Sequence, residues 1–334
     1  MTSRAQLSSR FIEAAGWDDA RRTILAGDAS PRRYDRLERT GDSAVLMDAD
    51  PATGEDVRPF IEIARHLSAL GLSAPRIFAA DTGHGFLLLE DLGDDLYARL
   101  LQRIPALEPE IYAAAVDVLA ELQRHPAPEG LDAYDAPAMA DLAALALDWY
   151  LPAATGQKVD RTGFVGLTQE LLARCAPAYD GLILRDYHAE NLLWLPERQG
   201  LARVGLLDFQ NAMRGHPAYD LVSLTEDARR DVPRPLAEAM QARMAKALGA
   251  DPESFGIACA ALAAQRNLRI LGVFARLWLR DGKPQYIPLL PRVWNHLMHD
   301  LSHPELASLR EEVMRLLPPP EPEVLERIRA CRTP

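Results

Sequence analysis

Lysine is missing from the first 157 residues of this 334-residue chain, in which the first lysine is Lys158. Carboxylates outnumber basic residues, so the formal net charge is −11, and the arginines are scattered among acidic residues. Binding to a phosphate backbone requires clustered Lys and Arg, so the composition argues against a nucleic-acid-binding protein. A phosphate-bearing small ligand needs only a few local cations and is compatible with this charge.

Long apolar runs and paired cysteines are also lacking. No uninterrupted apolar run approaches the ~18 residues that a membrane span needs. Residues 1–17 contain no continuous apolar segment before a cleavage site and predict a short amphipathic helix, not a signal peptide. Cys175, Cys259 and Cys331 form no CxxC pair, so we expect each to be a small buried side chain in a reducing compartment. The expectation is a cytoplasmic monomer that binds neither membrane nor nucleic acid.

The order of expected elements changes near residue 91. Residues 22–48 alternate and are rich in strand formers, and turn residues at 27–28 and 41–42 divide them into three predicted antiparallel strands. A helix at 58–70 ending at Gly71 and two strands at 76–81 and 86–91 follow. Beyond this point most of the chain predicts helices, at 94–103, 109–124, 137–150, 160–176, 217–229 and from Pro252 to about Asp281. We therefore predict an α+β fold of two lobes, with an N-lobe at 1–91 and a C-lobe at 92–334.

One stretch of short strands interrupts the predicted helices. Residues 182–185, which are apolar except for Arg185, predict a strand that precedes a polar loop, DYHAEN, at 186–191. Residues 192–195 and 204–207 are two apolar arms of matching length around a polar turn, which predicts a β-hairpin. The open end of a hairpin brings its two flanking residues together, so we expect Asn191 and Asp208 to be neighbours. Asp186 stands at the entrance of the same loop.

These three side chains suit phosphoryl transfer. Mg²⁺ prefers oxygen ligands and takes one or two carboxylates together with substrate phosphates. The D-x4-N spacing followed by D-F matches the catalytic arrangement of protein kinases, in which a carboxylate accepts the proton of the attacking hydroxyl. The alternative is that Asp186 and Asn191 cap turns and Asp208 ends a strand.

RDYHAENLL, LLDFQ and AYDL together resemble the catalytic core of the aminoglycoside phosphotransferase and choline kinase superfamily. The resemblance covers nearly the whole chain and implies a two-lobed protein-kinase-like fold that uses ATP and Mg²⁺. It implies Asp186 as the base, Asn191 and Asp208 as metal ligands, His188 as the loop histidine and Asp220 as support for the loop. GDASPRRYDRL, LLDFQNA and AYDLVSLTEDARRDV are similar to the N-acetylmuramate/N-acetylglucosamine anomeric kinases of bacterial cell-wall recycling.

The missing lysine requires an explanation, because a typical kinase has one on its third strand. Either the chain is a non-catalytic relic or arginine takes over, and the candidates are Arg32 and Arg33, whose guanidinium groups bind phosphate bidentately. Strand alternation points these two to opposite faces, so we expect only one to reach the nucleotide. Ser30 either binds phosphate or only forms the turn. Glu62 either orients the arginine or faces solvent.

The remaining candidates concern the base of the nucleotide and the acceptor. The adenine is expected against Glu90–Leu92, which makes Glu90 and Leu92 candidate nucleotide contacts. Arg266 and Asn267 are polar residues in an apolar helix, so they either bind a sugar or bond to neighbouring helices. The other candidate substrate contacts are His188, Glu190 and Gln210.

We therefore expect an ATP-dependent kinase that phosphorylates the C1 hydroxyl of a small N-acetyl amino sugar. The alternatives are a kinase for an aminoglycoside, choline or another amine, and a nucleotide-binding regulator without transfer activity. An amine acceptor favours an acidic pocket, whereas the segment 265–269 is basic.

Overall fold

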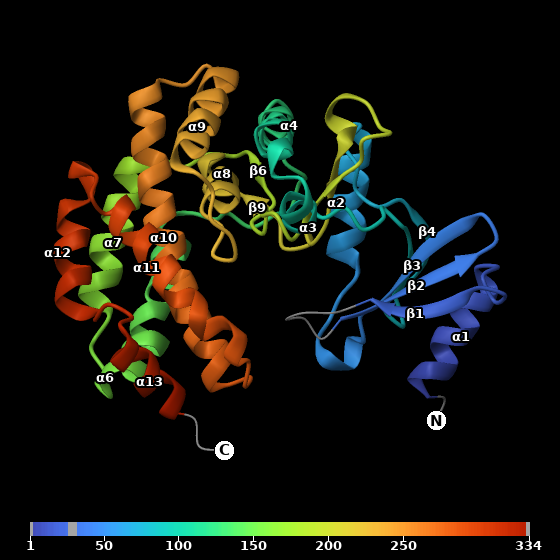
Figure 1. Cartoon of the computed structure of the whole chain (residues 1–334), viewed down its shortest axis with the longest axis horizontal. Coiled ribbons are helices and arrows are strands. Elements are labelled where there is room, and N and C mark those ends of the chain that lie inside the picture. Colours follow the sequence, from blue (N-terminus) through green and yellow to red (C-terminus); the bar gives the residue numbers. More distant parts are fainter. Residues whose placement is uncertain (1–2, 26–31, 332–334) are drawn as a thin grey trace. The chain divides into compact units, whose positions relative to one another are not determined.

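The structure is a computed structural model that describes residues 3–25 and 32–331. The chain divides into two compact units, and each unit contains two separate pieces of sequence (Figure 1). Unit 1 consists of Met1–Ala114 and Ala189–Asn211, and unit 2 consists of Ala115–His188 and Ala212–Pro334.

Unit 1 is built on an antiparallel five-stranded sheet with the strand order β1-β2-β3-β5-β4. The three predicted N-terminal strands and the two that follow the helix are all confirmed. Strands β2 and β3 pair along their whole length, from Arg33 opposite Asp48 to Arg39 opposite Asp42. The strands are β1 Arg21–Leu25, β2 Arg33–Arg39, β3 Asp42–Asp48, β4 Ile77–Asp81 and β5 Phe86–Glu90.

Helices flank this sheet. Helix α1 (Arg4–Ala14) begins with a capping box between Ser3 and Gln6, and its Ile12 packs with Leu37 and Leu46 in a buried apolar cluster. Helix α2 (Arg58–Ala69) is followed by Gly71 in the left-handed conformation, as predicted. The other helical segments of unit 1 are η1 Pro51–Thr53, α3 Tyr97–Arg103, η2 Pro105–Leu107 and η4 Gly200–Arg203, while α4 Glu108–Leu122 extends from unit 1 into unit 2.

The predicted hairpin forms and belongs to unit 1. Its arms are β7 (Leu192–Trp194) and β8 (Val204–Leu206). Single bridges join it to the rest of the unit, Ser73 with Gly205 and Leu96 with Leu193. Because of these links, unit 1 extends past the predicted lobe boundary at residue 91, and the functional division into 1–91 and 92–334 stays a prediction.

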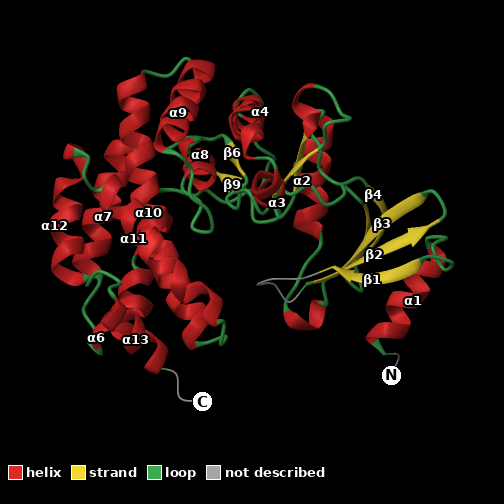
Figure 2. Cartoon of the chain, in the orientation of Figure 1, coloured by secondary structure: helices red, strands yellow, loops and turns green. Residues whose placement is uncertain are grey.

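Unit 2 is mostly helical, as Figure 2 shows by its secondary-structure colours. The predicted strand at 182–185 is shorter, β6 (Leu182–Ile183), and pairs with a strand that the sequence analysis missed, β9 (Met213–Arg214). The helical segments are α5 Ala136–Ala143, η3 Ala146–Tyr150, α6 Leu151–Thr155, α7 Thr162–Cys175, α8 Ala218–Thr225, α9 Arg234–Leu248, α10 Pro252–Leu279, η5 Pro284–Leu289, α11 Leu290–Asp300, η6 Pro304–Leu306, α12 Ala307–Leu316 and α13 Pro322–Ala330.

Helix α10 is the long buried helix of unit 2. Asp251 caps it by accepting a hydrogen bond from the Ser254 amide at 2.9 Å, as predicted. Its Gly272 lies so close to the main chain of Leu145 that a Cβ would come within 2.2 Å of the Leu145 carbonyl carbon. Length and composition alone would allow α10 to span a membrane, but 78% of its most apolar window is buried within the protein. It is therefore a core helix in this fold.

The cysteine prediction is correct at two positions and wrong at the third. Cys175 and Cys259 are buried, and burial raises the pKa of both thiols. Cys331 is exposed, because it follows the C-terminal end of α13.

Candidate active site

The open end of the β7–β8 hairpin brings the two predicted metal ligands together. Leu192 lies opposite Leu206, and one step further the Leu207 amide donates a hydrogen bond to the Asn191 carbonyl at 3.0 Å. Asp208 is the next residue along the chain. The hairpin geometry inferred from arm length is therefore present in unit 1.

Asp208 has a backbone conformation that few residues adopt. Its φ is 56°, in the left-handed region that Asp and Asn tolerate better than other side chains with a Cβ. The adjacent Phe209 is fully buried and stacks on Phe60 of α2 with a centroid distance of 4.8 Å. The Asp208 side chain itself is 46% exposed, and Gln210 Nε2 donates to its Oδ1 at 2.7 Å. Thus Phe209 anchors the segment while the Asp208 carboxylate remains accessible.

Arg32 is the arginine that the structure places at Asp208. Its Nη1 lies 3.9 Å from Asp208 Oδ1, and its Nε donates to Glu55 Oε2 at 2.6 Å. Burial opposes the charged form, yet the hydrogen bond to Glu55 and the nearby carboxylates raise the pKa of Arg32. Arg33 is exposed and lies opposite Asp48 in the sheet. Glu62 faces solvent, so Glu55 provides the carboxylate that orients the arginine.

Tyr34 lies beside the same groups. Burial raises the pKa of its phenol, and the Asp208 charge adds to this effect while Arg32 opposes it. Tyr34 therefore stays neutral at physiological pH and lies next to Arg32 and Asp208 as a polar group without charge. Ser30, the remaining phosphate-loop candidate, lies outside the described residues.

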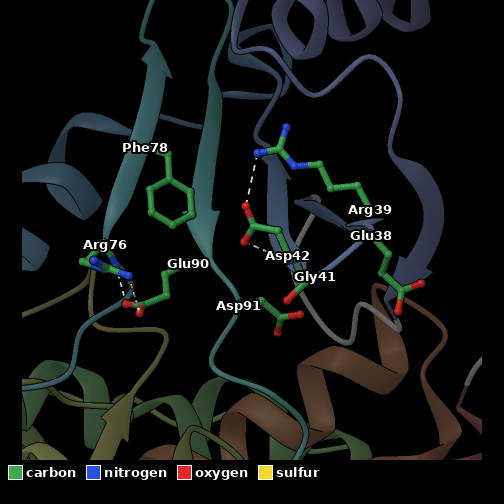
Figure 3. A pocket seen from close by; sticks show the side chains of 9 residues that line it. Glu38, Arg39, Gly41, Asp42, Arg76, Phe78, Glu90 and Asp91 are labelled. Carbon is green, nitrogen blue, oxygen red and sulfur yellow. Dashed lines mark hydrogen bonds and ion pairs between the residues drawn. The ribbon is translucent and has the colours of Figure 1, made fainter.

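The segment that is predicted to contact the adenine begins where β5 ends. Glu90 pairs with Arg198 at 2.9 Å and with Arg76 at 3.2 Å, so its carboxylate holds the segment in place. Leu92 is half-buried. A cavity of about 440 Å³ lies at this end of the sheet (Figure 3). It is lined by Glu38, Arg39, Gly41, Asp42, Ser43, Arg76, Phe78, Glu90 and Asp91.

An ion-pair network that the sequence analysis missed joins β2 to the segment after β5. Arg36 Nη2 lies 2.9 Å from Asp94 Oδ1 and donates to Asp91 Oδ1 at 3.1 Å. The hydrogen bond to Asp94 is the main reason that the pKa of Arg36 is raised. By strand alternation Arg36 shares a face with Tyr34. Only the D-x2-D spacing of Asp91 and Asp94 was visible in the sequence, and it gave no indication of the partner.

In unit 2 a buried carboxylate supports the start of the predicted catalytic loop. The amides of Leu184 and Arg185 donate to Asp220 at 2.6 and 2.8 Å. Burial raises the pKa of Asp220 to about 7, although both amide bonds favour the charged form. Arg185 has a φ of 70°, a strained conformation for a residue with a Cβ, which these bonds help to hold. The predicted supporting role of Asp220 is confirmed.

Asp186 follows directly after this support. Its amide donates to the Leu184 carbonyl at 2.9 Å, and its carbonyl accepts from the His188 amide at 3.2 Å. The side chain of Asp186 is half-buried, whereas Tyr187 is buried and donates its hydroxyl hydrogen bond to Ala115. The loop is thus held through its main chain and through Tyr187.

The candidate substrate residues differ in their surroundings. His188 is 9% exposed, and burial lowers its pKa to about 4, so the imidazole is neutral at pH 7. Glu190 is exposed, and Gln210 is hydrogen-bonded to Asp208. Asn267 donates to Glu226 at 2.8 Å and to Asp300 at 3.0 Å. Of the two alternatives for Asn267, the structure shows hydrogen bonds between segments of unit 2.

Comparison with known proteins gives consistent matches. A family model described as the phosphotransferase enzyme family matches residues 21–257. The N-acetylmuramate/N-acetylglucosamine kinase of Caulobacter vibrioides is 36% identical, covering 95% of this chain and 98% of that protein. The protein of the same name from Pseudomonas aeruginosa is 35% identical, covering 89% of this chain and 90% of that protein.

Solved structures show the same fold at low sequence identity. A choline/ethanolamine kinase family protein from Mesorhizobium loti superposes with a TM-score of 0.62 at 15% identity, covering 98% of this chain and 99% of that one. A choline kinase from Streptococcus pneumoniae gives 0.61 at 13% identity, covering 91% and 99%. The predicted α+β kinase-like fold is therefore confirmed.

Proposed function

The chain belongs to the phosphotransferase enzyme family and is a kinase, and from this premise we propose that it transfers the γ-phosphate of ATP to an N-acetyl amino sugar. The acceptor atom is the anomeric C1 hydroxyl of N-acetylmuramate, N-acetylglucosamine or both. The observation that carries the proposal is 36% identity over 95% of the chain to a kinase named for these two sugars. Such a reaction returns cell-wall sugars to metabolism, and we place it in the cytoplasm.

An amine acceptor is the rival reaction. The solved structures named as choline kinases support the fold alone, because their identity to this chain is 15% or less. A cationic acceptor favours an acidic pocket, whereas Arg266 is buried near the loop of Asp186 and His188. These observations favour a neutral or anionic sugar over an amine.

The nucleotide would lie along the face of the sheet that carries Tyr34 and Arg36. Residues 33 and 39 lie at opposite ends of β2, about 20 Å apart at ~3.3 Å per residue. Arg32, at one end, would bind the phosphates. Glu90 and Leu92, at the other end, would contact the adenine. An extended nucleotide can thus place its two ends at separate parts of one sheet.

Asn191 and Asp208 offer the oxygen donors that Mg²⁺ prefers, at the open end of one hairpin, so the residues fit this ion. When bound, Mg²⁺ would neutralise charge on the phosphates. Arg32 would add a second positive charge to the same region. Gln210 positions the Asp208 carboxylate through its hydrogen bond.

Asp186 is the proposed general base. Its carboxylate accepts the proton of the acceptor hydroxyl as that oxygen forms a bond to the γ-phosphorus. The bond from the γ-phosphorus to the bridging oxygen breaks, and ADP leaves with its electron pair. Asp220 holds the backbone that precedes Asp186 in place. The Asp186 carboxylate is therefore already positioned before the reaction begins, and no conformational entropy is lost to place it.

Replacement of Arg32 by alanine should weaken nucleotide use. We expect kcat/KM for ATP to fall by about 10- to 100-fold, the usual effect of losing a hydrogen bond to a charged group. Arg33→Ala is the matched control and should change it less than about 3-fold, because this side chain is exposed. Steady-state kinetics with varied ATP would measure both, with thermal unfolding as a check because Glu55 loses its partner. Equal effects of the two substitutions would contradict the role of Arg32.

The proposed reaction can be tested directly. The protein is incubated with ATP, Mg²⁺ and a panel of N-acetyl amino sugars, choline and aminoglycosides, and phosphate is followed by ³¹P NMR. A new sugar phosphate whose phosphorus couples to the anomeric proton supports the proposal. Transfer to choline or an aminoglycoside alone would assign the rival reaction, and no transfer to any acceptor would contradict both.

A further inference from the structure

Three consecutive polar residues are buried in the middle of helix α10. Gln265, Arg266 and Asn267 are 0%, 7% and 1% exposed. Gln265 donates to the Met139 carbonyl at 2.8 Å, and Asn267 donates to two carboxyl groups. Contacts within unit 2 thus satisfy the amide nitrogens of these two residues. Arg266 requires a different explanation.

Arg266 carries a buried charge without a counter-ion among residues 3–25 and 32–331. Its described hydrogen bond goes from Nη1 to the main-chain carbonyl of Glu226 at 3.2 Å. No described carboxylate lies within ion-pair distance of its guanidinium. A guanidinium offers five N–H donors, and a buried charge left unpaired is costly. The arrangement therefore suits an anionic partner that comes from outside the described chain.

A second buried group, the carboxylate of Asp227, has one oxygen without a hydrogen-bond donor among the described residues. Asp227 is 1% exposed, and its Oδ1 accepts from the Arg229 amide at 2.9 Å. Its Oδ2 is buried and accepts no hydrogen bond from any described residue. A carboxylate oxygen removed from water normally has a donor, so this atom can accept one from a ligand.

The two groups belong to adjoining segments of unit 2. The Arg266 guanidinium bonds to the carbonyl of Glu226, the residue that precedes Asp227. Both charges also affect the pKa of His188, which lies two residues after Asp186. They come from the loop after α8 and from α10, so separate segments of unit 2 converge there. The cluster combines a cation for an anionic group with an acceptor for a hydroxyl or amide, next to the proposed base.

We infer that Arg266 and Asp227 form a subsite for the acceptor sugar, in which Arg266 binds a carboxylate substituent and Asp227 Oδ2 accepts a hydrogen bond from the sugar. This inference rests on the proposed function. Of the two sugars in the names of the relatives, N-acetylmuramate carries a lactyl carboxylate and N-acetylglucosamine does not. Arg266 is thus the residue that distinguishes the two acceptors, while Asp227 contributes to both.

The test compares kcat/KM for both sugars in the wild type and in Arg266→Met, Arg266→Lys and Arg276→Met. Arg266→Met should lower the value for N-acetylmuramate by about 30-fold, the size of a lost charge-assisted interaction, and that for N-acetylglucosamine by less than about 3-fold. Arg266→Lys keeps the charge and should therefore retain part of the wild-type kcat/KM for N-acetylmuramate. Arg276, half-buried on the same helix, is the matched control, and its replacement should leave the ratio unchanged.

Other outcomes would overturn the subsite. A parallel loss of both activities in Arg266→Met would assign a structural role to Arg266, and an unchanged ratio would remove it from recognition. Asp227→Asn should reduce both activities about equally, and wild-type rates would exclude Asp227. If the wild type phosphorylates neither sugar, the proposed function is contradicted, whether or not the subsite exists. Calorimetric titration with N-acetylmuramate then decides the subsite: binding lost in Arg266→Met supports it, and no binding to the wild type overturns it.

Discussion

Asp186→Asn is expected to lower kcat by about 10³-fold, within the range that general bases contribute. Asparagine has nearly the same shape as aspartate, but it cannot take the proton of the acceptor hydroxyl. The main-chain bonds that hold position 186 do not involve its side chain, so they remain in the variant. The KM values for ATP and sugar should therefore change little, because the substitution affects the transition state more than ground-state binding.

The measurement is ADP release at saturating substrates, with circular dichroism and thermal unfolding to verify the fold. Asp180→Asn is a suitable control, because this carboxylate precedes the same segment and its side chain is 91% exposed. It should retain wild-type turnover. Wild-type kcat in Asp186→Asn would show that another group takes the proton and would remove Asp186 from the mechanism.

Asp208→Asn should produce the other large loss. Removing the negative charge weakens the hold on Mg²⁺, and we expect kcat to fall by about two to three orders of magnitude at ordinary Mg²⁺ concentrations. Asparagine tolerates the φ of 56° at this position, so the backbone should keep its conformation. The loss should diminish as Mg²⁺ is raised, since the defect lies in metal affinity.

Activity measured against a series of Mg²⁺ concentrations distinguishes this loss from misfolding. Asp81→Asn in the same unit is the control, because Asp81 pairs with His84 and has no contact with the hairpin that the structure describes. It should leave the Mg²⁺ dependence unchanged. If Asp208→Asn loses activity without any change in the Mg²⁺ requirement, Asp208 is not a metal ligand.

The parts of the fold that sequence predicted correctly depend on local patterns. Strand alternation and turn residues give β1 to β3, and the equal arms around a polar turn give the hairpin that brings Asn191 near Asp208. The pair β6 and β9 was missed because each strand has two residues and the two are far apart in sequence. Short strands of this kind depend on tertiary contacts and leave no periodic signal.

The contacts of the site were less predictable than its residues. Alternation predicted that Arg32 and Arg33 point to opposite faces, but only the structure shows which of them lies near Asp208. Glu55 lies in the loop before α2, and its pairing with Arg32 joins segments more than twenty residues apart. Such pairings are set by tertiary packing, which propensity and spacing do not encode. The same holds for Asn267, whose two partners lie on other segments.

The division of unit 1 into two pieces of sequence affects how the protein is made. A ribosome must complete residues 115–188 before it synthesises the hairpin that contacts Ser73 and Leu96. Until then the nascent N-terminal part lacks these contacts, and it also lacks Asn191 and Asp208. Translation therefore delivers the predicted metal ligands only after the first part of unit 2 has been made. A fragment that ends at residue 114, whether made by truncated synthesis or by proteolysis, therefore lacks the hairpin that belongs to unit 1.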